Sequence, residues 1–160
     1  DAIVEESYLT GNEVVYDLFC GTGSISLYLA KYAKKVYGFE LIMSAVQDAM
    51  QNAQRNNIKN TMFFAGDLMN LFRTNIEAQQ LEPPHVMIVD PPRAGLHPKT
   101  VEDLLDQNPE KIIYVSCNPS TQARDVKILC QNGFKLKKIR PVDMFPHTPH
   151  IENIATLVRN

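Results

Sequence analysis

Apolar residues along this chain form short runs that alternate with segments of helical spacing. Runs rich in β-branched and aromatic residues predict strands at residues 14–19, 35–40, 61–65, 86–89, 112–115, 134–139 and 154–158. Apolar residues at helical spacing predict a helix at residues 24–33. Helix-favouring composition and helix start and stop residues predict further helices at 44–56, about 68–79, 97–108 and 120–131. Strands that alternate with helices are typical of parallel sheets. The last two strands lack a helix between them, so we expect an antiparallel pair joined by a long loop, 141–153.

The pattern therefore predicts one α/β domain over residues 1–160, with a mostly parallel seven-stranded sheet and an antiparallel C-terminal strand pair. A hydrophobic share of 44% and a charged share of 21% fit an ordinary globular protein. No apolar run reaches the ~18 residues of a membrane-spanning helix, and no secretory signal pattern opens the chain. The first residue is Asp rather than Met, and we interpret the chain as a domain excised from a longer protein.

The cysteine count and the net charge narrow the choice of compartment and partner. Cys20, Cys117 and Cys130 show no metal-ligand spacing, so neither a disulfide frame nor a zinc site is expected. A reducing cytoplasm fits best. The net charge of −2 predicts that the domain alone grips RNA weakly, without excluding RNA as a substrate. We interpret the basic residues before the last strand as the solvated face of an edge strand rather than a phosphate contact: Lys135, Lys137, Lys138 and Arg140.

A glycine loop follows the first predicted strand, in the run Asp17-Leu18-Phe19-Cys20-Gly21-Thr22-Gly23. A glycine turn that opens a helix directs backbone N–H groups towards a ligand. The third glycine of a dinucleotide-binding fingerprint is replaced by Ser26, so that class is disfavoured. An acidic residue followed by two close glycines is similar to the S-adenosylmethionine loop of class I methyltransferases. Glu40 ends the second strand, where a carboxylate can accept hydrogen bonds from both ribose hydroxyls.

Two further residues near this loop have both a binding and a structural interpretation. Asp67 follows the third strand, where it can accept from an adenine amino group or cap the next helix. Phe19 either packs against the cofactor or is the last core residue of its strand.

The fourth strand ends in Asp90-Pro91-Pro92-Arg93. Enzymes that methylate amino groups carry an aromatic residue after such an Asp-Pro-Pro turn, to stack on the base. Arg93 replaces it, which argues against amino methylation and favours a cation near phosphate or base.

The fifth strand ends in Ser116-Cys117-Asn118-Pro119. Buried cysteines are commonly small core residues. The carboxyl ends of parallel strands, however, are where open α/β sheets bind ligands. Together with the other motifs, this position favours Cys117 as a nucleophile.

The segments DLFCGTG, GFE, DPPR, SCNP and MFPHTPHIE together resemble the RNA 5-methyluridine methyltransferases, over about residues 9–158. The resemblance implies a Rossmann-like class I fold with S-adenosylmethionine as cofactor and no metal in this part. It implies Cys117 as the nucleophile and Glu152 as the general base. The implied cofactor contacts are Phe19, Gly21, Gly23, Glu40, Asp67 and Asp90. Candidate substrate contacts are Arg93, Asn118, His147 and His150, although the histidines equally suit backbone contacts of their loop.

The implied reaction is methyl transfer to C5 of a uridine in RNA, through a covalent adduct between the cysteine and C6. The resemblance also implies a cytoplasmic monomer that acts on rRNA or tRNA. Family members carry an N-terminal RNA-binding part that is absent here, and an iron–sulfur cluster is possible only there. One alternative is an RNA amino-group or guanine methyltransferase that uses the Asp-Pro-Pro turn, with Cys117 incidental. Another is a non-catalytic RNA-associated module of the same fold.

Overall fold

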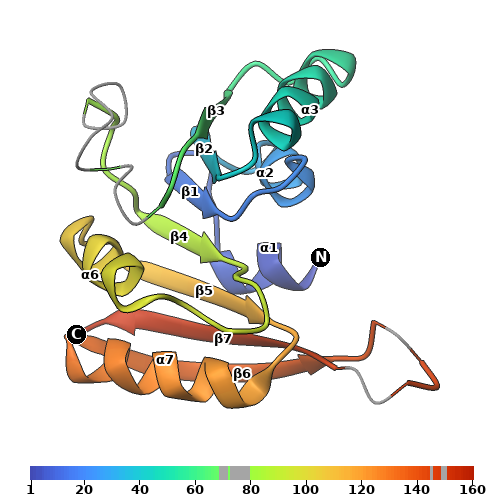
Figure 1. Cartoon of the computed structure of the whole chain (residues 1–160). Helices are drawn as coiled ribbons and strands as arrows, with labels where there is room; N and C mark the ends of the chain where they lie inside the picture. Colours follow the sequence, from blue (N-terminus) through green and yellow to red (C-terminus); the bar gives the residue numbers. More distant parts are fainter. Residues whose placement is uncertain (69–71, 73–79, 145, 149–150) are drawn as a thin grey trace.

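The computed structural model describes residues 1–68, 72, 80–144, 146–148 and 151–160. They build one twisted sheet with the strand order β3-β2-β1-β4-β5-β7-β6 (Figure 1). Its strands are β1 (Val14–Leu18), β2 (Lys35–Glu40), β3 (Thr61–Ala65), β4 (Val86–Val89), β5 (Lys111–Ser116), β6 (Phe134–Val142) and β7 (Glu152–Arg159). The helices are α1 (Ala2–Ser7), α2 (Ser24–Leu29), α3 (Met43–Arg55), α6 (Pro98–Asp106) and α7 (Pro119–Gln131).

The first five strands run parallel, and β7 lies antiparallel between β5 and β6. The central strands β1 and β4 are buried along their whole length, as expected for strands covered on both faces. This arrangement confirms the predicted α/β class and the antiparallel pair at the C-terminus.

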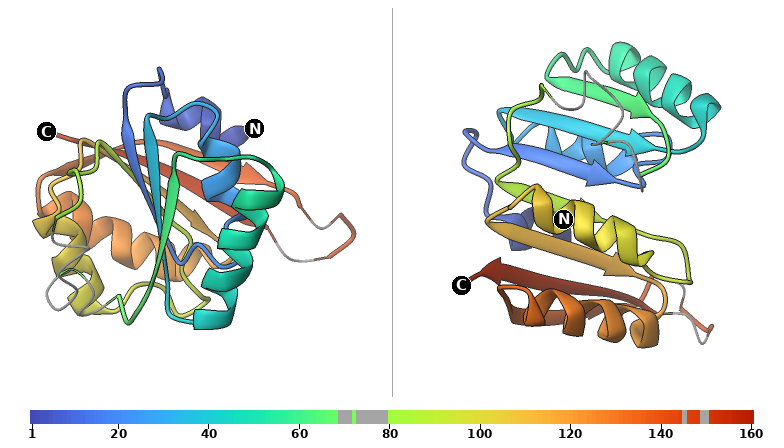
Figure 2. Two further views of the ribbon diagram at one scale, coloured as in Figure 1. Left: turned by 90° about the horizontal axis from the view of Figure 1, so that it is seen from above. Right: turned by 60° about the vertical axis from the view of Figure 1, so that its left-hand side comes forward.

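Helices cover both faces of the sheet (Figure 2). On one face Val15 packs with Leu29 of α2 and with α1, while α3 packs against β3. On the other face Tyr16 belongs to the cluster that includes Leu104 of α6 and Leu129 of α7. The alternation of side chains along each strand therefore supplies both layers of the core.

The structure corrects several predicted boundaries. The strand pair is longer than expected, so the connecting loop shrinks to residues 143–151. Pro141 belongs to β6, the outermost strand, where its missing N–H removes no bond from the sheet interior. Helix α2 ends at Leu29, four residues early, because residues 30–33 form turns. The helix expected at about 68–79 lies almost entirely outside the described residues.

Helix α1, which the apolar pattern did not predict, is tied to the edge strand by ion pairs. The buried carboxylate of Glu6 lies 2.6 Å from Lys138 Nζ, and Glu5 lies 2.5 Å from the Arg140 guanidinium. The basic face of β6 is solvated, as predicted, but Lys138 and Arg140 also hold α1 against the sheet. Without Lys138, the buried Glu6 carboxylate would keep Arg140, 3.5 Å away, as a cationic partner.

Candidate active site

Two cavities lie at the carboxyl ends of the parallel strands. The first, of about 630 Å³, contains Cys117, Asp90 and Glu152, and we call it the Cys117 cavity. The second, of about 520 Å³, contains Glu40, Phe19 and Asp67, and we call it the Glu40 pocket. A further cavity of about 580 Å³ between α3 and β3 is lined by neither carboxylate nor cysteine. The candidate chemistry therefore concentrates at one edge of the sheet.

Three strands supply the reactive groups of the Cys117 cavity. Cys117 directly follows β5, Asp90 directly follows β4, and Glu152 is the first residue of β7. The antiparallel ladder pairs Ser116 with Asn153. The neighbouring strand β7 thus positions Glu152 next to Cys117, through strand pairing rather than through the loop that precedes β7.

Helix α7 fixes the ends of both strands. The buried Gln122 amide donates to the carbonyl oxygens of Tyr114, at 2.8 Å, and Asn153, at 3.0 Å. Asn153 in turn donates its side-chain amide to Gln122. These bonds join β5 and β7 at positions three residues before Cys117 and one residue after Glu152.

Buried carboxylates near this edge hold protons more tightly than usual. Burial raises the pKa of Asp90 to about 6, and the negative charge of Glu152 adds to the rise. Burial also raises the pKa of Asp17 to about 7, against the opposing hydrogen bond from Ser26. The Cys117 cavity therefore combines a thiol and the Glu152 carboxylate with Asp90, whose pKa is raised.

The walls of the Cys117 cavity include residues that the sequence did not single out. Apolar side chains come from β5, β7 and the end of β6, and α1 supplies the opposite wall. These lining residues are Val115, Ile154, Val142, Met144, Asp1, Ala2 and Ile3. Arg140, one of the basic residues named from the sequence, also lines the cavity. Strand alternation relative to Cys117 and Glu152 was the signal for Val115 and Ile154. The apolar part of this wall suits a planar base, and the charged side chains offer partners for its polar edge.

Glu40 organises the Glu40 pocket. Its carboxylate accepts from the Gly21 N–H and from the Ile42 N–H, each at 3.0 Å. Each oxygen retains a lone pair for a further donor. Beside it Leu41 and Ile42 are 65% and 58% exposed, large apolar residues that the sequence reasoning missed. Their position directly after the carboxylate was the available signal.

The glycine loop leaves room beside Glu40. A Cβ on Gly21 would meet nothing within 4 Å, whereas Gly23, at φ +83°, is packed against Ala49 and Phe63. Phe19 has φ +65°, an uncommon conformation for a bulky residue, and lines the pocket. An acceptor for a diol, an open glycine turn and apolar surfaces fit a nucleoside. Asp67 lines the same pocket, so its position is compatible with the predicted cofactor contact.

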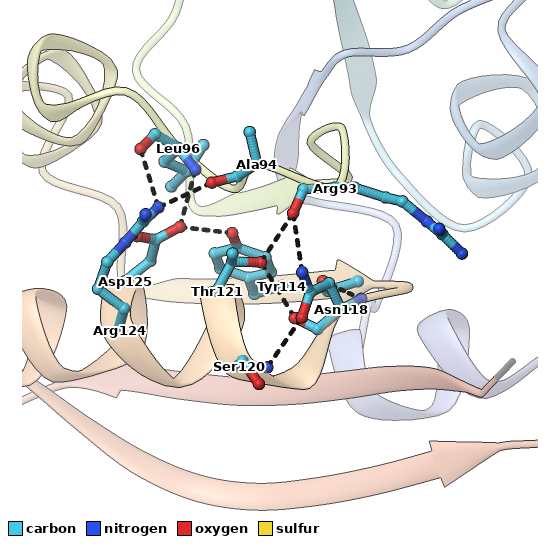
Figure 3. A network of polar contacts seen from close by, with 10 residues as sticks. Arg93, Ala94, Leu96, Tyr114, Asn118, Ser120, Thr121, Arg124 and Asp125 are labelled. Carbon is cyan, nitrogen blue, oxygen red and sulfur yellow. Dashed lines mark hydrogen bonds and ion pairs between the residues drawn. The ribbon is translucent and has the colours of Figure 1, made fainter. Parts of the chain in front are cut away.

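The predicted substrate contacts are distributed differently. Arg93 is exposed, and its side chain points away from α7 while its carbonyl faces the helix (Figure 3). The Asn118 side chain donates to that carbonyl at 3.1 Å and accepts from the Ser120 N–H at 3.1 Å. His147 is exposed, with φ +70°. His150 lies outside the described residues.

Metal ligands and membrane spans were searched over the described ranges. There, no three His, Cys, Asp or Glu side chains come together as a group that could hold a metal ion. In the same part of the chain, no helix has the length and apolarity to cross a membrane.

The strand order, the glycine loop after β1 and Glu40 at the end of β2 define a class I methyltransferase fold. Residues 6–160 match the family model described as tRNA (Uracil-5-)-methyltransferase, and the chain belongs to this family. It is 45% identical to an uncharacterized RNA methyltransferase of Chlorobaculum tepidum over 159 residues, 99% of this chain and 33% of the relative. It is 49% identical to another from Porphyromonas gingivalis, covering 95% of this chain and 33% of the relative.

A solved structure shows the same fold. The tRNA (uracil-54, C5)-methyltransferase of Pyrococcus abyssi, in complex with S-adenosyl-L-homocysteine, superposes with a TM-score of 0.82 at 38% identity. The match covers 98% of this chain and 37% of that one. The chain thus spans about a third of the length of the curated relatives it matches.

Proposed function

We propose that this chain is the catalytic domain of a longer RNA methyltransferase that methylates C5 of a uridine in RNA, with S-adenosylmethionine as methyl donor. The observation that carries the proposal is the cavity that brings Cys117, Glu152 and Asp90 together beside the Glu40 pocket. The family, and the relative named for C5 of uracil-54, support uracil as the target base.

The Glu40 pocket suits the cofactor. Glu40 would accept from the ribose hydroxyls, while Phe19, Leu41 and Ile42 offer apolar surface for the adenine ring. Asp67 is the proposed acceptor for the adenine amino group. When bound, the cofactor supplies an electrophilic methyl group on a sulfonium sulfur.

Cys117 would act as the nucleophile. Uracil C5 is too weak a nucleophile to take a methyl group unaided. The Cys117 thiolate forms a bond to C6, and the electrons of the C5–C6 double bond move towards O4, giving an enolate that is reactive at C5. The position of Cys117 at the end of β5, facing a cavity with apolar walls, favours attack on a base held flat against those walls.

Glu152 would act as the general base. After C5 has gained the methyl group, it still carries its original proton. Transfer of that proton to the Glu152 carboxylate regenerates the C5–C6 double bond, and the Cys117 thiolate leaves. Glu152 lies on the strand next to Cys117, so one cavity serves both addition and elimination.

Asp90 and Arg93 flank this chemistry from the loop after β4. Asp90 lines the Cys117 cavity and can hold the N3–H or O4 edge of the base, according to its protonation. The Arg93 cation is a candidate partner for the negative charge that develops on O4 or for a nearby phosphate.

Trapping the covalent adduct tests the proposal. In full-length protein incubated with S-adenosylmethionine and RNA containing 5-fluorouridine, the fluorine at C5 cannot leave as a proton does. The adduct therefore persists and is visible as a slower band in a denaturing gel. We expect the band to disappear in Cys117→Ser and to remain in the matched control Cys130→Ala, which alters the cysteine on α7.

Separate reactions with tRNA and rRNA transcripts, followed by nucleoside mass spectrometry, identify the substrate and the product. 5-Methyluridine in one transcript supports the proposed reaction. A methylated exocyclic amine, or methylation that survives Cys117→Ser, would contradict it in favour of an amino-group methyltransferase.

A further inference from the structure

The loop that follows β4 contributes residues to both cavities. Asp90, at its start, lines the Cys117 cavity. Pro92 and Gly95, further along, line the Glu40 pocket. Any shift of this loop therefore changes the distance between the base and the methyl donor.

Side chains of α7 and of its N-cap residue donate hydrogen bonds to the backbone carbonyls of this loop (Figure 3). The Arg93 carbonyl accepts from the Asn118 side-chain amide and from the Thr121 hydroxyl, each at 3.1 Å. The Ala94 carbonyl accepts from the Arg124 guanidinium at 3.0 Å. The first of these donors, Asn118, directly follows Cys117. The segment that follows the thiol therefore also binds the loop after β4.

The buried Asp125 side chain adds further hydrogen bonds to this contact between the loop and α7. It is 1% exposed and accepts from the Leu96 N–H and from the Tyr114 hydroxyl, each at 2.7 Å. Its other oxygen accepts from Arg124 Nε at 2.8 Å. One buried carboxylate thus joins the loop, α7 and the central strand β5.

The loop and the helix are as close as their backbones permit. A Cβ built on Gly95 would lie 2.6 Å from Asp125 Oδ2 and 2.7 Å from Arg124 Nη2, and φ at Gly95 is +78°. Only glycine fits this position without displacing the loop from α7.

We propose that Asn118, Thr121, Arg124 and Asp125 form a clamp that sets the spacing between the Cys117 cavity and the Glu40 pocket. Arg124 and Asp125 are then positioning residues for methyl transfer. This role rests on the function proposed above. Transfer requires the attacking C5, the methyl carbon and the sulfur in line, and a misplacement of about 1 Å can reduce the rate about 100-fold.

Three measurements on the full-length protein separate alignment from folding. Binding of S-adenosylhomocysteine reports the Glu40 pocket alone. Without cofactor, exchange of the C5 hydrogen of uridine in D₂O reports the Cys117 cavity alone: the thiolate adds to C6, C5 takes a deuteron from solvent, the original proton leaves and the thiolate is expelled. Methyl transfer requires the Cys117 cavity and the Glu40 pocket to be correctly spaced and aligned.

Arg124→Ala cuts the clamp, and Gly95→Ala pushes the loop away from it. In both variants we expect kcat for methylation to fall about 10- to 100-fold. In Arg124→Ala, whose side chain lines neither cavity, the dissociation constant and the exchange rate should stay within about threefold of the unaltered protein. Gly95 lines the Glu40 pocket, so Gly95→Ala is compared by its kcat and its exchange rate alone. The double variant should lose little more than either single variant, because both act on one displacement. Arg124→Lys should recover part of the rate, and Lys127→Ala, an exposed change on the same helix, should leave all three values unchanged.

Two outcomes would overturn the clamp role: unchanged methylation in both variants, or a parallel fall of cofactor binding, exchange, methylation and melting temperature in Arg124→Ala. The second outcome would mean that these residues only stabilise the fold. Failure of the proposed function is distinguishable, because unaltered protein would then show neither exchange nor 5-methyluridine.

Discussion

Ser116 on β5 pairs with Asn153 on β7, so Cys117 and Glu152 are the next residues along two hydrogen-bonded neighbouring strands. The proposed nucleophile and the proposed base, 35 positions apart in the chain, thus lie next to residues that pair in the same sheet ladder. Backbone hydrogen bonds, rather than a flexible loop, set their separation. Changes at these two side chains should therefore alter chemistry with little effect on the fold.

Replacing the proposed base should stall the reaction after methyl transfer. In Glu152→Gln the C5 proton has no acceptor, so the covalent adduct with ordinary uridine RNA should accumulate while turnover falls about 100- to 10,000-fold. A denaturing gel and intact-mass measurement detect the adduct. Glu110→Gln, a change at an exposed glutamate, serves as the control. Normal turnover in Glu152→Gln would exclude this residue as the base.

Glu40 should determine cofactor affinity. In the unaltered protein, the two Glu40 oxygens accept from the Gly21 and Ile42 N–H groups. Glu40→Gln keeps one acceptor oxygen but loses the second acceptor and the negative charge. A lost charge-assisted hydrogen bond of about 1.5–3 kcal/mol predicts a dissociation constant for S-adenosylhomocysteine about 10- to 100-fold higher. Titration calorimetry measures the dissociation constant, and Asp48→Asn, at an exposed position of α3, serves as the control. An unchanged constant would argue against the Glu40 pocket as the cofactor site.

The buried Asp17 should make stability depend on pH. Its pKa is raised from 3.8 to about 7, so between pH 4 and pH 7 the folded state holds a proton that the unfolded chain releases. Raising the pH through this window should therefore lower the free energy of unfolding, by at most about 4 kcal/mol from this residue. Urea unfolding at several pH values should show a flatter dependence in Asp17→Asn. An identical slope in both proteins would contradict the assignment.

Gly38 should tolerate no side chain. A Cβ there would lie 2.5 Å from a Phe63 ring carbon and 2.9 Å from Cys20 Sγ. We expect Gly38→Ala to lower the free energy of unfolding by about 1–3 kcal/mol through overpacking. Adding Phe63→Leu should restore part of the loss if the ring is the obstacle. Chemical unfolding of the single and double variants tests this coupling.

Much of the fold could be predicted from the sequence because the central strands are buried on both faces. Val86–Val89 is apolar throughout, and residues 14–18 end directly at the glycine loop. Pairing across an edge strand leaves a weaker signal in the sequence. The pattern ends this strand at residue 139 and begins the loop at Pro141, although the ladder continues to Val142. Helix α1 was missed because its stability depends on Glu6 reaching Lys138, a contact across 132 positions.

The candidate site was predictable where a residue type carries the chemistry, and not where geometry does. Cys117 and Glu40 stand in recognisable motifs at strand ends. That Asn118 holds the Arg93 carbonyl depends on how closely two loops approach, which no local pattern encodes. The α1 wall of the Cys117 cavity likewise depends on tertiary packing.

Strand β7 is the last strand of the sheet to be synthesised, although it does not lie at the edge of the sheet. Because β7 lies between β5 and β6, the sheet has a vacant slot until residues 152–159 have been synthesised. A nascent chain that stops short of them exposes two unpaired strand edges and contains no Glu152. Completion of the sheet and arrival of the proposed base thus coincide, so a chain terminated before residue 152 would lack both.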